Sequence, residues 1–102
     1  MTAPAYLIVD MAMSDPGRYR EYMAKAQALV KEYGGEYLVR GGRHETIEGD
    51  WSASRVVLLR FPSYEQVKAF YDSDAYREVR AMRSGASHFF NMILVEGVDA
   101  PV

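Results

Sequence analysis

The chain has 102 residues, of which 49% are hydrophobic, 25% charged and 13% aromatic, and its formal net charge is −2. This length is typical of one domain, so we expect a single domain over residues 1–102 with its core between about residues 5 and 97. The hydrophobic content excludes intrinsic disorder, and the absence of a basic field argues against nucleic-acid binding. Because there is no cysteine, disulfides, thiolate catalysis and cysteine-zinc sites are excluded.

The segment from Met1 to Pro4 carries no basic side chain, and the apolar stretch after it is interrupted by Asp10. This pattern is neither a secretory signal nor a membrane span, so we expect a soluble cytoplasmic protein that does not bind membranes. The sequence has no glycine-rich phosphate loop, no nucleophile elbow and no paired-histidine motif. We therefore predict no nucleotide, no metal site and no cofactor, and nothing in the sequence supports a haem ligand.

The first third of the chain predicts a strand and a helix. Residues Ala5–Met13 are short, apolar and rich in branched side chains, as in a strand. Ser14–Pro16 supplies a capping side chain followed by a proline, which is the signature of a helix start. Apolar residues then recur at spacings of three and four up to Tyr33, and Gly34–Gly35 ends the helix.

The middle of the chain predicts two strands. Glu36–Arg40 is the first, and the glycine pair after it, Gly41–Gly42, indicates a bulge or a close backbone approach. The segment Arg43–Ser54 is polar, and Thr46–Trp51 within it is expected near the tip of a hairpin. Arg55–Phe61 follows as the clearest strand of the sequence, since five of its seven residues are valine, leucine or phenylalanine.

The last third predicts a second helical region and a final strand. Ser63 is a good helix cap, and Gln66 stands three residues later, where it would complete a capping box. The sequence Asp72–Asp74 indicates a break, after which further helical turns run to Ser84–Gly85. Phe89–Val95 is the last predicted strand.

The predicted element order, β-α-β-β-α-β, indicates an α+β ferredoxin-like fold, with a four-stranded antiparallel sheet and the helices on one face. Three strands carry apolar side chains at both odd and even positions, which is typical of a sheet buried on both sides. Two helices cover only one side, so we expect a second copy of the chain to cover the other in a sheet-to-sheet homodimer. The alternative is a partly exposed antiparallel face.

Several segments resemble the domain-of-unknown-function 1330 family, over about residues 6–97. The segments that carry the resemblance are Tyr33–Gly42, Glu48–Gly49, Arg55–Val57, Phe61–Ser63, Tyr71–Ser73 and Val95–Gly97. The glycine-flanked Tyr-Leu-Val-Arg segment within the first of these is the most specific. The resemblance implies a dimeric α/β-barrel protein, a superfamily that includes cofactor-independent monooxygenases, muconolactone isomerase and haem-dependent peroxidases. It implies no particular reaction, because a fold does not determine chemistry.

Two residues are candidate catalytic groups. Asp10 is a carboxylate among apolar neighbours on the predicted dimer-facing side, where it could act as a base, or could instead pair with Arg40 or Arg60. His44 could act as a general base near neutral pH, or could lie on a solvated hairpin. The other histidine, His88, reads as a polar residue at a strand end.

Five residues are candidate ligand-binding groups. Arg40 and Arg43 flank the glycine pair and could hold a carboxylate or enolate. Tyr6 and Tyr37 lie on strands whose alternation could aim them into a cavity. Trp51 could cover a pocket or contact the second subunit, and either use would bury its ring. The contact with the second subunit is the favoured interpretation.

The sequence thus leaves three hypotheses open. The first is an enzyme acting on an anionic or aromatic molecule, by oxygenase-like or isomerase-like chemistry without a cofactor, in a pocket beside the dimer-facing sheet. The second is a non-catalytic module that binds such a molecule, and the third is a structural homodimer without a pocket.

Overall fold

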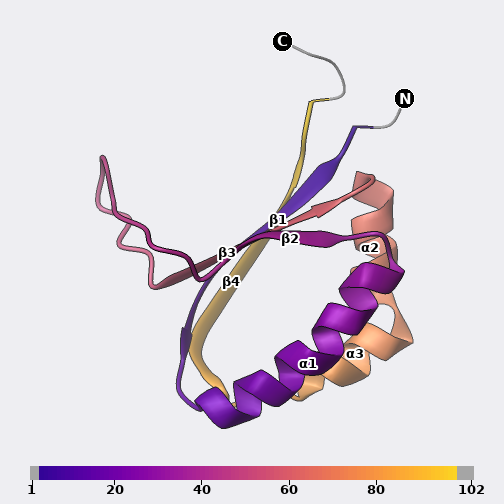
Figure 1. The fold of residues 1–102 in the computed structure, drawn as a ribbon, viewed down its shortest axis with the longest axis horizontal. Helices are drawn as coiled ribbons and strands as arrows, with labels where there is room; N and C mark the ends of the chain where they lie inside the picture. Colours follow the sequence, from indigo (N-terminus) through magenta and orange to yellow (C-terminus); the bar gives the residue numbers. More distant parts are fainter. Residues whose placement is uncertain (1–2, 99–102) are drawn as a thin grey trace.

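The computed structural model describes residues 3–98, so the two ends of the predicted domain, residues 1–2 and 99–102, lie outside it. Residues 3–98 form four strands and three helices (Figure 1). In chain order they are β1 (Ala5–Met13), α1 (Pro16–Glu32), β2 (Glu36–Arg40), β3 (Arg55–Phe61), α2 (Tyr64–Asp72), α3 (Asp74–Ala81) and β4 (Ser87–Glu96). The predicted break in the second helical region is the junction between α2 and α3.

The strands form one antiparallel sheet in the order β2-β3-β1-β4. The central strand β1 pairs with β3 on one side and β4 on the other, so that Leu7 lies opposite both Leu59 and Leu94. All three helices pack on the same face of this sheet (Figure 1). The predicted ferredoxin-like fold is confirmed.

Local capping explains where the helices begin. Asp15 caps α1, because its carboxylate accepts a hydrogen bond from the Arg18 backbone N–H at 3.1 Å, and Pro16 occupies the first turn. Ser63 caps α2 by accepting from the Gln66 N–H at 3.1 Å. The predicted capping box is only half formed, since the side-chain amide of Gln66 donates to the Tyr33 carbonyl oxygen at 3.0 Å and not to the backbone of Ser63.

Ser73 forms the junction between α2 and α3. Its hydroxyl donates to the Phe70 carbonyl oxygen at 2.8 Å and accepts from the Tyr76 N–H at 3.1 Å. One side chain therefore satisfies a carbonyl at the end of one helix and an N–H at the start of the next. The backbone of Ser73 is extended, which turns the chain between the two helices.

The hydrophobic core lies between the helices and the sheet. Every second strand residue points into it, as strand alternation requires. The buried strand and helix side chains are Ala5, Leu7, Val9, Met11, Tyr19, Tyr22, Ala26, Val30, Val57, Leu59, Phe61, Val67, Phe70 and Tyr76. Phe70 is central among them, because its ring lies 4.3 Å from that of Tyr76 and 5.2 Å from that of Phe61, measured between centroids.

The opposite side of the sheet, called here the open face, has no helix over it. It carries the other set of strand side chains, most of which are apolar, with Asp10, Arg60 and Asn91 among them. Ile93 is 58% exposed, Val95 42% and Phe89 39%, whereas Val56 and Leu58 are half-buried. The predicted burial is therefore seen on the helix side, whereas the open face is uncovered in the single chain and its burial against a second copy stays a prediction.

Candidate functional site

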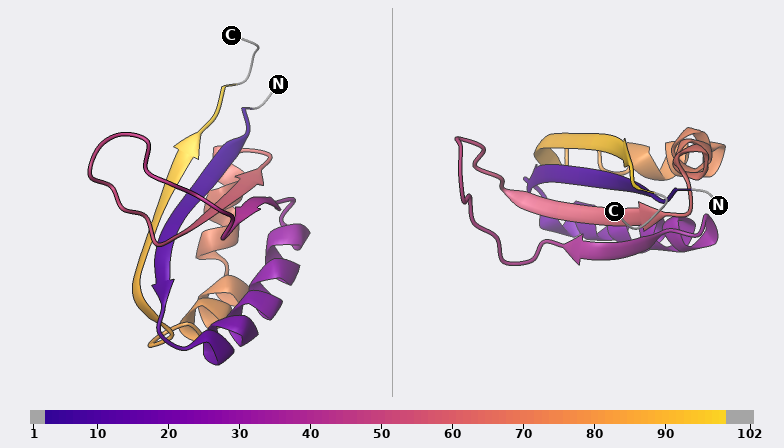
Figure 2. Two further views of the ribbon diagram at one scale, coloured as in Figure 1. Left: turned by 60° about the vertical axis from the view of Figure 1, so that its left-hand side comes forward. Right: turned by 90° about the horizontal axis from the view of Figure 1, so that it is seen from above.

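Residues 41–54, called here the arm, connect β2 to β3 as an irregular loop. Figure 2 shows the arm projecting from the sheet away from the three helices. Asp10 on β1 fixes the part of the arm that leads into β3. One of its carboxylate oxygens accepts a hydrogen bond from the Trp51 indole N–H at 3.0 Å, and the other accepts from the Ser54 backbone N–H at 2.9 Å. These two hydrogen bonds, that to Trp51 foremost, lower the pKa of Asp10 despite an opposing desolvation.

His44 bridges the two sides of the arm. Its Nε2 lies 3.0 Å from the Ala53 carbonyl oxygen, and its Nδ1 lies 3.2 Å from the Gly42 carbonyl oxygen. Two acceptors facing the ring favour the form in which both nitrogens carry a proton, so they raise the pKa of His44. Both predicted catalytic residues thus lie at the arm, where the hydrogen bonds to their polar atoms hold the loop together.

A hollow of about 520 Å³ lies under the arm, bordered by His44, Trp51, Ala53 and Val56 with arm residues 45–48. Two large apolar side chains of its wall are themselves mostly exposed to solvent, Ile47 by 86% and Trp51 by 62%. Glu45 and Glu48 are the acidic side chains of this wall. The hollow therefore has little to attract an anion.

A bulge in β2 determines where Arg40 points. Tyr37 pairs with Leu59 and Val39 with Leu58, so Leu38 is an extra residue between them. Without that extra residue in the register, Arg40 would pair with Val56 and face the open side. With it, Arg40 pairs with Val57 and faces the helices, where its guanidinium lies 5.1 Å from the Tyr37 ring centroid.

This placement separates Arg40 from the two predicted catalytic residues. Asp10 and His44 belong to the open face and the arm, whereas Arg40 and Tyr37 belong to the helix side. The alternative prediction, an ion pair between Asp10 and an arginine, is wrong: Asp10 bonds to the arm, and Arg60 lies 3.6 Å from Glu36 instead.

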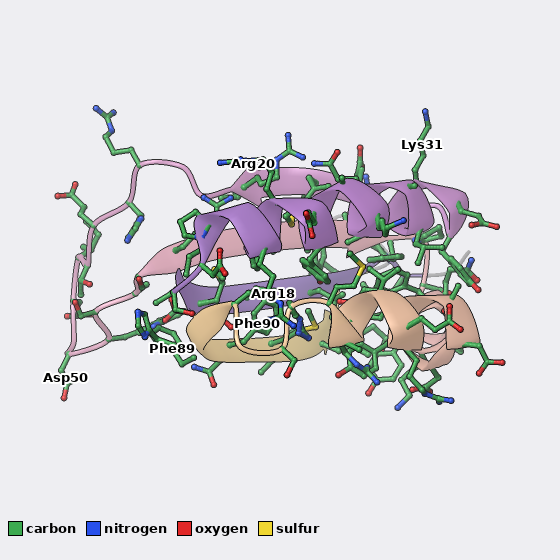
Figure 3. The ribbon with its side chains drawn as sticks, turned by 90° about the horizontal axis from the view of Figure 1, so that it is seen from below. Arg18, Arg20, Lys31, Asp50, Phe89 and Phe90 are labelled. Carbon is green, nitrogen blue, oxygen red and sulfur yellow. The ribbon has the colours of Figure 1, made fainter. Side chains whose placement is uncertain are left out.

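A second hollow, called here the arginine pocket, lies at the edge of the helix layer between α1 and the ends of β2 and β3. Its volume is about 260 Å³. Its walls are Met13, Pro16, Tyr19, Arg20, Met23, Gln27, Arg40 and Arg55. Figure 3 shows Arg20 on the outer side of α1, pointing away from α3. Three guanidinium groups and no carboxylate border this pocket.

Arg55 is the most enclosed of the three arginines. Its Nε atom is buried and has no hydrogen-bond partner. The guanidinium packs on the backbone of Gly41, where a Cβ would overlap it, and Gly41 has a φ of +71°. The close backbone approach predicted at the glycine pair is therefore confirmed at Gly41, and the bulge lies at Leu38, just before that pair.

Inward of the arginine pocket, tyrosines line a small cavity of about 20 Å³. Tyr19 and Met23 form walls of both spaces. The hydroxyls of Tyr22 and Tyr76 lie 2.6 Å apart and bond to each other. Burial raises the pKa of Tyr37 to about 12 and also raises that of Tyr19, so both phenols are neutral at physiological pH.

The remaining predicted site residues lie apart from this pocket. Tyr6 is half-buried at the other end of β1, next to Gly97, and Arg43 is exposed on the arm. Sequence reasoning missed Arg55 and Arg20. Strand alternation could have indicated Arg55, because it stands two residues before Val57 in the buried register, and helical spacing places Arg20 beside Met23.

Within residues 3–98 no three histidine, aspartate or glutamate side chains gather as they would around a metal ion. None of the helices described is both long and apolar enough to cross a membrane.

Solved structures with the same fold are similar to this chain over nearly its whole length. A protein of unknown function from Rhodopseudomonas palustris superposes with a TM-score of 0.74 at 16% identity, covering 98% of this chain and 86% of that one. A Caulobacter crescentus protein provisionally described as an antibiotic biosynthesis monooxygenase gives 0.63 at 15% identity, covering 96% and 92%. A protein from Thermobifida fusca described as dimeric and ferredoxin-like gives 0.61 at 10% identity, covering 94% and 92%. At these identities the likeness concerns the fold alone.

Among curated protein sequences, none matches the chain. The model of one family, described as a domain of unknown function (DUF1330), matches residues 4–98, which is almost the entire sequence. The chain belongs to the DUF1330 family.

Proposed function

We propose that the protein is a homodimer, joined through the open faces of two sheets, that binds a small anionic or aromatic molecule in the arginine pocket of each subunit. The observation that carries the ligand-binding part is the pocket itself, whose described walls comprise three arginines, the Tyr19 ring and apolar side chains, with no carboxylate among them. The sequence prediction placed the ligand beside the dimer-facing side of the sheet. We instead place the ligand on the helix side of the sheet, because Arg40 points there.

The homodimer is supported by the chemistry of the open face. Exposed Phe89, Ile93 and Val95 on β4 and half-buried Val56 and Leu58 on β3 lie on either side of the central strand β1. An apolar area of this kind on one sheet face is typical of an interface. Two large apolar side chains of the arm, Ile47 and Trp51, are exposed and would extend the interface onto the second copy. Structural neighbours described as dimeric ferredoxin-like proteins support the same assembly.

A binding role fits Asp10 and His44 better than a catalytic one. Hydrogen bonds to the arm engage both oxygens of Asp10, and a lowered pKa makes a carboxylate a weaker base. Both ring nitrogens of His44 face carbonyl oxygens, which favours the charged ring with a proton on each nitrogen. That form has no free lone pair with which to accept a proton from a substrate. Their predicted catalytic role remains a prediction, and in this proposal they position the arm.

A second candidate function is oxygenation of an aromatic compound without a cofactor. It is favoured by the fold shared with two proteins provisionally described as antibiotic biosynthesis monooxygenases, from Caulobacter crescentus and Nitrosomonas europaea. Oxygen uptake by the purified protein in the presence of a polyhydroxylated aromatic compound, lost in an Arg40→Gln variant, would establish this function. Retained binding without uptake would identify a binding module.

The assembly is tested by two matched substitutions. Ile93→Arg places a charge in the open face, and Ala28→Arg places the same charge on the exposed side of α1. Light scattering of the wild type and of Ala28→Arg should give twice the 11.6 kDa chain mass. Ile93→Arg should give the single-chain mass at micromolar concentration with an unchanged far-ultraviolet circular dichroism spectrum. A wild type of single-chain mass would contradict the homodimer.

A further inference from the structure

The arginine pocket concentrates positive charge in a protein that is acidic overall. The net charge of the chain is −2, yet Arg20, Arg40 and Arg55 border one hollow of about 260 Å³. Within residues 3–98 the ion pairs that form involve other arginines, Arg60 with Glu36 and Arg77 with Asp74. Neighbouring guanidinium groups repel one another, so an anion between them would relieve an unfavourable field.

The most enclosed donor of the pocket has no partner inside the protein. The Nε–H of Arg55 is buried without an acceptor, and such a group is costly to leave unpaired. Gly41 lets the guanidinium pack against the backbone, so the side chain is held in one place. Arg55 is half-buried and borders the pocket, so the Nη atoms of this fixed guanidinium, and not the buried Nε, are the donors offered to a ligand oxygen that arrives from outside.

The other walls of the pocket are apolar or aromatic. Met13, Pro16 and Met23 lie beside the Tyr19 ring, and Met23 and Tyr19 also border the inner cavity. This side suits a flat hydrocarbon surface. The volume is slightly below the roughly 300–1,000 Å³ typical of sites for drug-sized ligands, which favours a molecule with one ring.

We propose that the arginine pocket binds a monocyclic aromatic carboxylate. Its carboxylate would lie between Arg40 and Arg55, and its ring would lie against Tyr19 and Met23. A planar carboxylate accepts two parallel N–H bonds from a guanidinium, whereas a spherical anion does not match this fork. The inference rests on the proposed function, and it specifies which small molecules the same site takes.

The ligand class is tested by calorimetric titration of the wild-type protein with four probes. Benzoate carries both features, benzamide lacks the charge, cyclohexanecarboxylate lacks the aromatic ring, and inorganic phosphate lacks any hydrocarbon. We expect benzoate to bind at least about tenfold more tightly than benzamide, because hydrogen bonds to a charged group contribute more than neutral ones. We expect cyclohexanecarboxylate and phosphate to bind more weakly than benzoate.

Two variants and a control locate the site. Arg40→Gln and Arg55→Gln should each weaken benzoate binding by about tenfold or more, whereas Arg77→Gln removes the same charge from α3 and should leave it unchanged. Thermal unfolding of each variant reports whether its fold is retained. If Arg55→Gln does not fold, the exposed Arg40 still carries the test.

Four results would overturn the inference. Benzamide binding as tightly as benzoate would remove the role of the charge, yet it would leave the proposed small-molecule site standing. Phosphate binding as tightly as benzoate would identify a general anion site. Failure of all four probes to bind, or benzoate binding that is insensitive to both arginine substitutions, would show that the pocket does not take this class, while the homodimer is decided separately by the mass of Ile93→Arg.

Discussion

The hydroxyl groups of Tyr22 and Tyr76 form a buried pair at 2.6 Å between α1 and α3. Each is the other's hydrogen-bond partner, and both side chains are buried. A buried hydroxyl that loses its partner keeps the cost of its desolvation, whereas a pair replaced by two apolar groups does not. The pair therefore matters more for what happens when one member is removed than for the bond itself.

We predict that Tyr22→Phe lowers the free energy of unfolding by about 1–3 kcal/mol, because it leaves the Tyr76 hydroxyl unpaired. Urea unfolding measures the change. The double variant with Tyr76→Phe should recover part of this loss, since no buried hydroxyl is then left alone. Additive losses in the two single variants and the double variant would show that the two hydroxyls do not interact.

His44 gives the arm a dependence on pH. The Ala53 and Gly42 carbonyl oxygens raise its pKa above the usual 6.5, because they face both ring nitrogens. The charged ring therefore supports the folded arm fully below pH 6.5, and this support is lost as the pH rises through the raised value. At high pH the neutral ring has one N–H, so it donates either to Ala53 across the arm or to Gly42 beside it, and the other hydrogen bond is missing.

We predict that a proton NMR titration of His44 gives a midpoint above 6.5. The arm should become more mobile over the same pH range, which relaxation measurements on the Gly49 amide at its tip would detect. A His44→Gln variant should remove this pH dependence and serves as the control. A midpoint at or below 6.5 would contradict the bridging geometry.

At the scale of elements, Ser73 links α2 and α3 through one hydroxyl that both donates and accepts. We predict that Ser73→Ala lowers the free energy of unfolding by about 1 kcal/mol, as expected for the loss of a helix cap. Urea unfolding measures it, with Ser52→Ala on the exposed arm as the control. An equal effect of the two substitutions would argue against a capping role for Ser73.

The elements themselves were predictable because their signals are local. An aspartate followed by a proline, as at Asp15 and Pro16, favours a helix start when an apolar stripe follows. The alternation of Val57, Leu59 and Phe61 likewise predicts a strand without knowledge of the strands beside it. Strands β1, β2 and β3 have the predicted bounds, and β4 extends slightly further at both ends. The break between α2 and α3 was also marked by its own residues.

The candidate site was less predictable because it depends on pairing between strands. Nothing in the sequence of β2 shows that Leu38 is the extra residue opposite β3, and that single residue determines which face receives Arg40. Sequence reasoning therefore grouped Arg40 with Asp10 and His44. Asp10 was recognised as unusual, but its partners, Trp51 and the Ser54 N–H, lie far from it in the chain and could not be identified.

At the scale of the whole molecule, the two faces of the sheet have different roles. The helix side holds the core and, at its edge, the arginine pocket. The open face has apolar side chains on β1, β3 and β4 and no helix to cover it. Burial of this face against an identical face would give a closed twofold dimer, in which the two arginine pockets lie on the outer sides of the two sheets.

The most direct test of this account is an NMR measurement on a sample refolded from equal amounts of isotope-labelled and unlabelled chains. Filtered spectra record only contacts between the two chains. We predict cross-peaks among methyl groups of the open face, such as those of Ile8, Leu58 and Ile93, and none from Val30 or Val67 in the core. Cross-peaks that arise from the helix surface, or none at all at millimolar concentration, would contradict the pairing of the two open faces.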